Sequence, residues 1–127
     1  MDTEKIVTTL SEMGGKRWQK AGKDRVYFNT DMVLKLAGLD YATYNTGRIS
    51  GATFKDGHIS NTDCGRILGT MSRFSFWFDL TDGKFYVQGG LSESTARWMN
   101  GEEFFTPQTI WKTARTQLSK AIGPFIN

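Results

Sequence analysis

Hydrophobic and polar residues alternate most regularly between residues 73 and 88, where RFSFWFDL is followed by TDG and then by KFYVQ. Alternation on both sides of an Asp-Gly pair predicts a β-hairpin, because Asp-Gly favours the tight type I′ turn. With Asp82 and Gly83 as the two turn residues, Phe78 faces Val87 across the hairpin. The residues expected on its core-facing side are Phe74, Phe76, Phe78, Leu80, Phe85 and Val87. The residues expected on the other side are Ser75, Trp77, Asp79 and Tyr86.

A second hairpin is predicted over Lys16–Asn29, because KRWQK and RVYF both have strand-like compositions. The four residues from Ala21 to Asp24 supply its turn. A four-residue loop there places Lys20 opposite Arg25, and Trp18 opposite Tyr27. The expected composition of one face is Lys16, Trp18, Lys20, Arg25 and Tyr27, with Gln19, Val26 and Phe28 behind it.

Helices are predicted where apolar residues recur every three to four positions between capping residues. The last of them begins at Pro107, after the capping residue Thr106, and is stopped by Gly123-Pro124. The other expected helices are Asp2–Met13, ended by Gly14-Gly15; Asp31–Leu36, stopped at Gly38; Asn61 to about Met71; and Ser92–Met99, closed by Asn100-Gly101.

Between these elements, Arg48–Phe54 is predicted to be a strand and Tyr41–Gly47 to be irregular. The resulting class is α+β: a small antiparallel sheet built from hairpins, with several short helices on one face and a C-terminal amphipathic helix. No internal repeat or linker-like segment interrupts the sequence, so residues 1–127 are expected to form a single domain.

Composition agrees with a packed sheet more than with a helical bundle. Aromatic residues make up 13% of the chain, and 14 glycines accompany only 2 prolines. The formal charge is a modest +3, but its distribution is uneven. The ten residues from Lys16 to Arg25 hold five cations against one acid, and after Glu103 the charged side chains are all cationic.

One cysteine excludes an intramolecular disulfide. The first residues, MDTEKIVTTLSEMGG, are acidic where a secretory signal would be basic and then apolar. No stretch approaches the roughly 18 apolar residues of a membrane span. A cytoplasmic location without membrane contact is therefore expected.

Searches for catalytic motifs favour a protein that is not an enzyme. The sequence has no phosphate-binding glycine loop, no dinucleotide-binding fingerprint and no Cys-x-x-Cys. Its single histidine, His58, follows a predicted Asp-Gly turn, and its single cysteine, Cys64, fits a small buried residue. We assign no catalytic residue, no metal ligand and no cofactor.

The basic segment within Lys16–Tyr27 is the strongest candidate site. Aromatic rings flanked by cations are typical of single-stranded nucleic-acid binding, where bases stack on rings and cations hold phosphates. The opposite interpretation places Trp18 and Tyr27 in the core, with lysine stems lying over them. The candidate binding residues in this segment are Lys16, Arg17, Trp18, Lys20, Lys23, Arg25 and Tyr27.

Two further pairs of residues lie outside this segment. Lys112 and Arg115, on the polar side of the last helix, could extend the binding surface or simply be solvated. Trp77 and Tyr86, on the non-core side of the central hairpin, are either covered by a helix or exposed as a patch. In an α+β domain whose sheet is covered on both faces, the first alternative is favoured.

The opening GGKRW, followed by Lys20, Gly22, Asp24-Arg25, Tyr27 and Asn29, resembles that of small uncharacterised proteins of phages and other mobile elements. Those proteins also tend to have a later segment like GATF and ISN, which stand here at residues 51–54 and 59–61. The resemblance covers roughly the first half of the chain and implies no catalytic residue. It implies a phage or plasmid context, in which small proteins often bind nucleic acid or inhibit host defence.

Two functional hypotheses follow. The first is a basic accessory protein that binds DNA or RNA through the Lys16–Tyr27 hairpin. The second is an anti-CRISPR-like module that inhibits a host defence complex or nuclease without binding nucleic acid, its Trp, Tyr and Arg side chains serving as interface anchors. A homodimer through Trp77 and Tyr86 is a variant of the second.

Overall fold

The computed structural model describes residues 1–45, 48–54, 57–59, 61–89, 98–100 and 103–126, with side-chain surroundings for residues 1–39, 66–89 and 106–126. Its fold is α+β, as the sequence predicts. The helices are α1 (Thr3–Glu12), α2 (Thr30–Leu36), α3 (Asn61–Met71) and α4 (Pro107–Ile126). The strands are β1 (Gly15–Lys20), β2 (Lys23–Phe28), β3 (Leu39–Asn45), β4 (Arg48–Phe54), β5 (Gly57–Ile59), β6 (Phe74–Asp79), β7 (Lys84–Gly89), β8 (Trp98–Asn100) and β9 (Glu103–Phe105).

The main sheet joins the two predicted hairpins. Its strand order is β1-β2-β6-β7, and all neighbours are antiparallel. The contact between the hairpins is made by β2 and β6, with Val26 opposite Phe78 and Phe28 opposite Phe76. Four consecutive residue pairs align there, so apolar positions of both hairpins fall on the same side.

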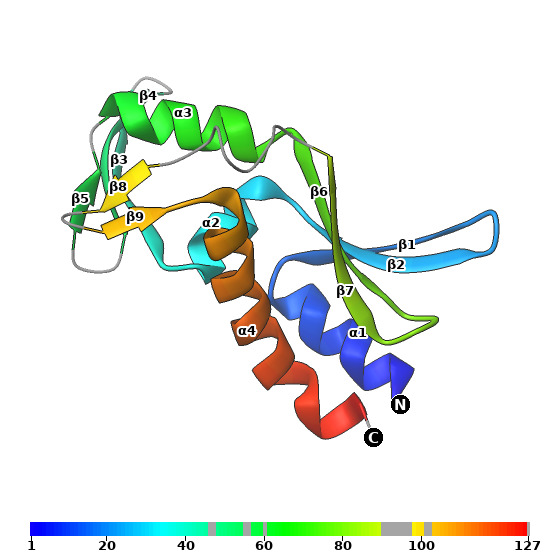
Figure 1. Ribbon diagram of the computed structural model, residues 1–127. Helices are drawn as coiled ribbons and strands as arrows, with labels where there is room; N and C mark the ends of the chain where they lie inside the picture. Colours follow the sequence, from blue (N-terminus) through cyan, green and yellow to red (C-terminus); the bar gives the residue numbers. More distant parts are fainter. Residues whose placement is uncertain (46–47, 55–56, 60, 90–97, 101–102, 127) are drawn as a thin grey trace.

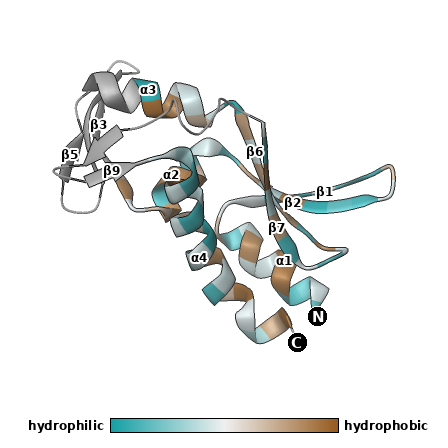
Figure 2. Ribbon diagram, in the orientation of Figure 1, coloured by the Kyte–Doolittle hydropathy of each residue, from teal (hydrophilic) through white to brown (hydrophobic). Residues whose placement is uncertain are grey.

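Helices cover that apolar side, which we call the inner face. Gly15 shows how closely α1 approaches, because a Cβ at this position would lie 2.5 Å from Val26 Cγ1 and 2.8 Å from the carbonyl oxygen of Leu10. From α4, Trp111 meets Phe76 with ring centroids 4.9 Å apart. Apolar residues recur along these helices and β6, whereas the β1-β2 hairpin is hydrophilic toward its tip (Figures 1 and 2). The fully buried residues of this core include Ile6, Leu10, Val26, Phe76, Phe78, Ile110 and Leu118.

A smaller substructure lies at the other end of the molecule, where α3 runs above the three-stranded sheet β3-β4-β5 and the two-stranded sheet β8-β9 (Figure 1). The predicted strand Arg48–Phe54 and the helix ending at Met71 are confirmed. The prediction of an irregular Tyr41–Gly47 is wrong for residues 41–45, because Leu39–Asn45 pairs with β4 along most of its length; residues 46–47 lie outside the described part. The helix expected over Ser92–Met99 is also wrong at its end, where Trp98 begins β8; its residues 92–97 lie outside the described part.

The tip of the first hairpin has two residues instead of the expected four. Lys20 pairs with Lys23, so only Ala21 and Gly22 turn the chain, with φ angles of 54° and 79°. Positive φ at both positions is the signature of the type I′ turn, whose twist matches that of the flanking strands. Trp18 therefore lies opposite Arg25 instead of Tyr27.

The prediction for the second hairpin is wrong in the opposite direction, because its loop has four residues instead of the expected two. Asp79 pairs with Lys84, so Phe78 faces Phe85 instead of Val87. Leu80, buried in the core, donates its backbone N–H to the carbonyl of Asp24 at 2.9 Å and so remains tied to β2. Both errors move the register by two positions, so every strand residue stays on its predicted face.

The last helix continues past its expected stop. Pro124 lies inside α4, and the final turn still forms because Phe125 and Ile126 pack against the core. The carbonyl of Phe125 also accepts a hydrogen bond from the backbone N–H of Asp2 at 2.7 Å, which links the two ends of the described chain. The packing of these residues therefore stabilises the last turn by more than the loss of the helical hydrogen bond at Pro124 destabilises it.

The turn at the first hairpin tip generates a stability prediction. Ala21 adopts the left-handed conformation that costs a residue with a Cβ about 1 kcal/mol, and asparagine tolerates it better. We expect Ala21→Asn to raise the free energy of unfolding in urea by about 1 kcal/mol. Gly22→Ala is the matched control. A Cβ added at this position would meet no atom within 4 Å, so the loss of stability expected for this variant comes only from its positive φ angle. A change in the free energy of unfolding of the same sign for both substitutions would contradict this account of the turn.

Candidate functional site

The side of the main sheet away from α1 and α4, which we call the outer face, is made of alternate residues of all four strands. Cross-strand pairing arranges them in rows. The first row is Lys16, Tyr27, Trp77 and Tyr86; the second is Trp18, Arg25, Asp79 and Lys84; Lys20 and Lys23 form a third at the hairpin tip. Ser75 and Gln88 complete the face beyond the first row.

Four aromatic rings form a continuous chain across this face. Trp18 meets Tyr27 edge to face, with centroids 6.1 Å apart, and Tyr27 is 5.6 Å from Trp77. Trp77 in turn stacks on Tyr86 at 5.7 Å with an interplanar angle of 17°. Trp77 is buried, with only 6% of the residue exposed, and Tyr27 is half-buried, whereas Trp18 and Tyr86 are 40% and 37% exposed. Ring surface is therefore available at both ends of the chain.

Arg25 links the aromatic chain to the charges. Its guanidinium carbon lies 4.5 Å from the centre of the Trp77 ring, and its Nη1 donates a 2.8 Å hydrogen bond to the hydroxyl of Tyr27. A cation over an indole is a favourable contact that also fixes the ring beneath it. Arg25 Nε and Trp77 Nε1 are both buried, and neither N–H finds a hydrogen-bond acceptor in the protein.

The outer face is strongly cationic. It carries five basic side chains, four of them exposed lysines, against the single carboxylate of Asp79. A second carboxylate, Asp82, lies in the β6-β7 loop and accepts a hydrogen bond from the Tyr86 hydroxyl. The cations surround the aromatic chain from Lys16 on one edge of the sheet to Lys84 on the other.

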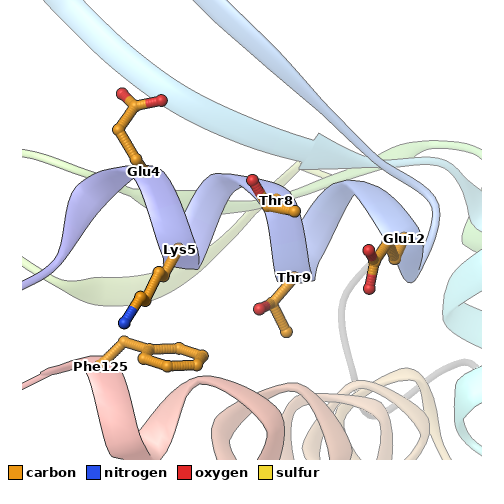
Figure 3. A pocket seen from close by; sticks show the side chains of 6 residues that line it. All are labelled: Glu4, Lys5, Thr8, Thr9, Glu12 and Phe125. Atoms are coloured by element: carbon orange, nitrogen blue, oxygen red, sulfur yellow. The ribbon is translucent and has the colours of Figure 1, made fainter.

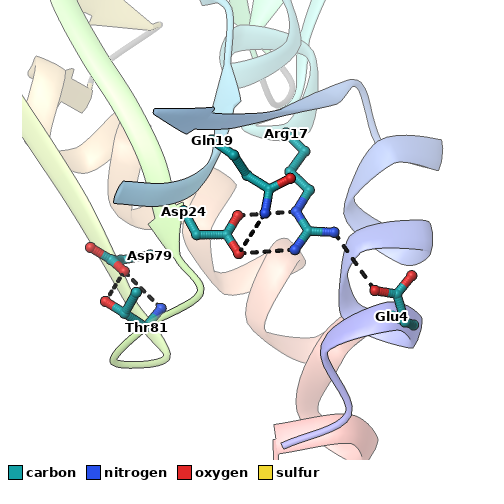
Figure 4. Close-up of polar contacts among 6 residues, drawn as sticks. All are labelled: Glu4, Arg17, Gln19, Asp24, Asp79 and Thr81. Atoms are coloured by element: carbon teal, nitrogen blue, oxygen red, sulfur yellow. Dashed lines mark hydrogen bonds and ion pairs between the residues drawn. The ribbon is translucent and has the colours of Figure 1, made fainter. Parts of the chain in front are cut away.

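Both carboxylates are engaged within the loop between β6 and β7. Burial raises the pKa of Asp79, but the hydrogen bonds that Thr81 donates from its hydroxyl and backbone N–H, with the charge of Arg25, lower it further than burial raises it (Figure 4). The net pKa lies below the ordinary value of 3.8. For Tyr86, the hydrogen bond to Asp82 raises the pKa above 10.0, so this ring stays uncharged at neutral pH.

Arg17 does not join the outer face. It points to the opposite side of the hairpin, where its Nε and Nη2 contact Asp24 at 3.0 and 2.9 Å and its Nη1 lies 3.7 Å from Glu4 (Figure 4). Two parallel hydrogen bonds to one carboxylate are the strongest geometry available to arginine. Arg17 thus holds the hairpin against α1 instead of presenting a free charge.

Lys112 and Arg115 also lie apart from this face. Both are exposed on α4, and α4 packs against the inner face through buried residues that include Trp111 and Ala114. The sheet itself therefore separates these cations from Trp18 and Lys20. The structure brings together six of the nine residues singled out from the sequence: Lys16, Trp18, Lys20, Lys23, Arg25 and Tyr27.

Three outer-face residues, Trp77, Tyr86 and Lys84, were not among the nine. The expectation that a helix covers Trp77 and Tyr86 is wrong for the described helices, which pack on the inner face. Alternation within the central hairpin had already placed both rings on its non-core side. The missing information was which strands of the two hairpins pair: β2 with β6.

The remaining candidate features of the described chain are its histidine, its cysteine and one hollow beside α1. The backbone of His58 lies in β5 and that of Cys64 in α3, but their side chains are outside the described part. Among the described residues, no three His, Cys, Asp or Glu side chains come together as metal ligands would. A shallow hollow of about 290 Å³ lies between α1 and the end of α4 (Figure 3). It is lined by Glu4, Lys5, Thr8, Thr9, Glu12 and Phe125, and its Lys5 ammonium lies over the Phe125 ring at 5.7 Å.

Comparison with models of known protein families, with curated proteins and with solved structures gives no match. Within the described residues, no helix combines the length and the apolar character needed to cross a membrane.

The lowered pKa of Asp79 generates a prediction on acid stability. A carboxylate with a lowered folded-state pKa stabilises the fold above its ordinary pKa, and this contribution is lost as the pH falls through the folded-state value. Thr81→Val removes one of the stabilising hydrogen bonds. We expect urea unfolding to show the variant less stable than the wild type at neutral pH, with the difference shrinking below the ordinary value of 3.8.

Thr116→Val is the matched control, since the Thr116 hydroxyl donates to a backbone carbonyl of α4 and not to a carboxylate. Its effect should not depend on pH in this range. A Thr81→Val effect that is constant across the range would contradict the assigned role of Asp79.

Proposed function

We propose that this chain is a small, non-enzymatic nucleic-acid-binding accessory protein whose binding surface is the outer face of the main sheet. The observation that carries the proposal is the arrangement of Trp18, Tyr27, Trp77 and Tyr86 in one continuous chain among five cations, on the face opposite the covering helices. Aromatic rings and cations on one surface match the two parts of a nucleotide, because bases stack and phosphates attract cations.

Electrostatics favours an anionic ligand over an apolar one. Lys20 and Lys23 lie side by side at the hairpin tip, where two like charges repel each other unless an anion lies near both. Lys16 and Lys84 carry the positive field to the two edges of the sheet. A polyphosphate strand that crosses the face would meet cations along its whole path.

The cellular setting forms part of the same proposal. The opening segment resembles that of small proteins from phages and other mobile elements, in which nucleic-acid binding is a frequent role. The cationic hairpin Gly15–Phe28 is also the segment in which the resemblance is densest. We therefore propose an accessory role in the handling of phage or plasmid nucleic acid in the cytoplasm.

Salt dependence tests this proposal. Each phosphate neutralised by a cation releases counterions, so the logarithm of affinity should fall linearly with the logarithm of salt concentration. In fluorescence anisotropy with labelled DNA and RNA, we expect Lys20→Gln/Lys23→Gln to weaken binding and to reduce this slope by roughly 1 to 2.

Lys112→Gln/Arg115→Gln removes the same charge from α4 and serves as the control. Its affinity should stay within about threefold of the wild type, because only the weak long-range field changes. Absence of binding by the wild-type protein even at low salt would contradict nucleic-acid binding. Capture of a host protein by the same face would then favour the inhibitor hypothesis.

A further inference from the structure

We infer that the ligand of the outer face is single-stranded, and that two of its unpaired bases stack on Trp18 and Tyr86, one at each end of the aromatic chain. This inference rests on the proposed nucleic-acid binding and names the form of nucleic acid. Phosphate attraction alone would serve a duplex equally well. The argument for a single strand comes from the exposed rings.

Tyr86 presents a ring surface that the protein does not use. One side of the ring stacks on Trp77, nearly parallel to it, and the strand β7 that carries it is the last of the sheet. The ring is nevertheless 37% exposed. A base on its free side would continue the existing stack outward, and its hydroxyl, bound to Asp82, holds the ring in place.

Trp18 occupies the equivalent position at the other edge. It lies on β1, contacts Tyr27 edge to face instead of by stacking, and is 40% exposed. Trp18 does not contribute to the hydrophobic core, because it is exposed on an edge strand and the residue opposite it on β2 is Arg25 and not an apolar side chain. Stacking of a base on such a ring contributes about 1–3 kcal/mol, measured as the loss on substitution by alanine.

Trp77 is a positioning residue between these two ends. It is buried under Arg25 and between Tyr27 and Tyr86, so it keeps both neighbouring rings at fixed angles. Its indole N–H and the Nε–H of Arg25 are buried donors without a protein acceptor.

The two exposed rings favour an unpaired strand over a duplex. Trp18 and Tyr86 lie on strands separated by three strand spacings, which is about 14 Å. In a duplex the faces of the bases are covered by neighbouring pairs, so they are not free to stack on a protein ring. Two bases can stack on both rings only if the strand is unpaired and long enough to span that separation.

The experiment compares ligands that share phosphates but differ in their bases. Labelled single-stranded DNA and RNA of roughly 12 nucleotides, a duplex of the same length and an abasic strand of the same length are titrated at one salt concentration. We expect the single strands to bind at least about tenfold more tightly than the duplex and the abasic strand. Trp18→Ala and Tyr86→Ala should each weaken single-strand binding by about 5- to 100-fold.

Conservative variants separate stacking from folding. Trp18→Phe and Tyr86→Phe keep a ring at each position and should bind single strands more tightly than the corresponding alanine variants. Equal affinity for the single strand, the duplex and the abasic strand would overturn this inference and leave the proposed function intact. So would alanine variants that fold normally, as judged by circular dichroism, and bind unchanged. Failure of all ligands to bind would overturn both.

Discussion

Antiparallel pairing between β2 and β6 is the constraint on which both faces of the main sheet depend. It aligns Val26 with Phe78 on the side covered by helices, and Tyr27 with Trp77 on the side that is not. These strands are separated in the sequence by α2, the three-stranded sheet β3-β4-β5 and α3. Without this pairing the two hairpins would remain separate, and the helices would have no continuous sheet to pack on. The aromatic chain would divide into two pairs of rings.

The two faces of the main sheet differ in their cover, and we propose different roles for them: stability for the inner face and binding for the outer face. On the inner face, α1 and α4 bury an apolar surface whose centre is Phe76, Phe78 and Trp111, and burial of that kind is the main force that favours folding. The bidentate pair of Arg17 and Asp24 joins β1 to β2, and Arg17 also forms an ion pair with Glu4 of α1. A sheet already stabilised from one side can keep rings and cations exposed on the other, where a packed helix would have hidden them.

Much of this arrangement could be predicted from the sequence, because face assignment depends only on alternation. Trp77 and Tyr86 were placed together on one face and Phe76 and Phe78 on the other, although the predicted turns of both hairpins were wrong. Those turn errors preserved the faces because each moved the register by two. Which strands join the two hairpins could not be predicted, since pairing between distant strands leaves no local signal. Arg17 was grouped with the cations by its charge alone, although alternation places it on the opposite face, where it pairs with Asp24.

The central claim, that nucleic acid binds to the outer face, can be tested most directly by observing tryptophan indole N–H signals in NMR spectra during titration with a single-stranded oligonucleotide. Trp18 and Trp77 lie on the outer face, and Trp111 lies in the core beneath the inner face, so one spectrum contains both the reporters and their control. We predict large shifts for Trp18 and Trp77, assigned by substitution, and little change for Trp111. Unchanged Trp18 and Trp77 signals at saturating ligand would contradict the account.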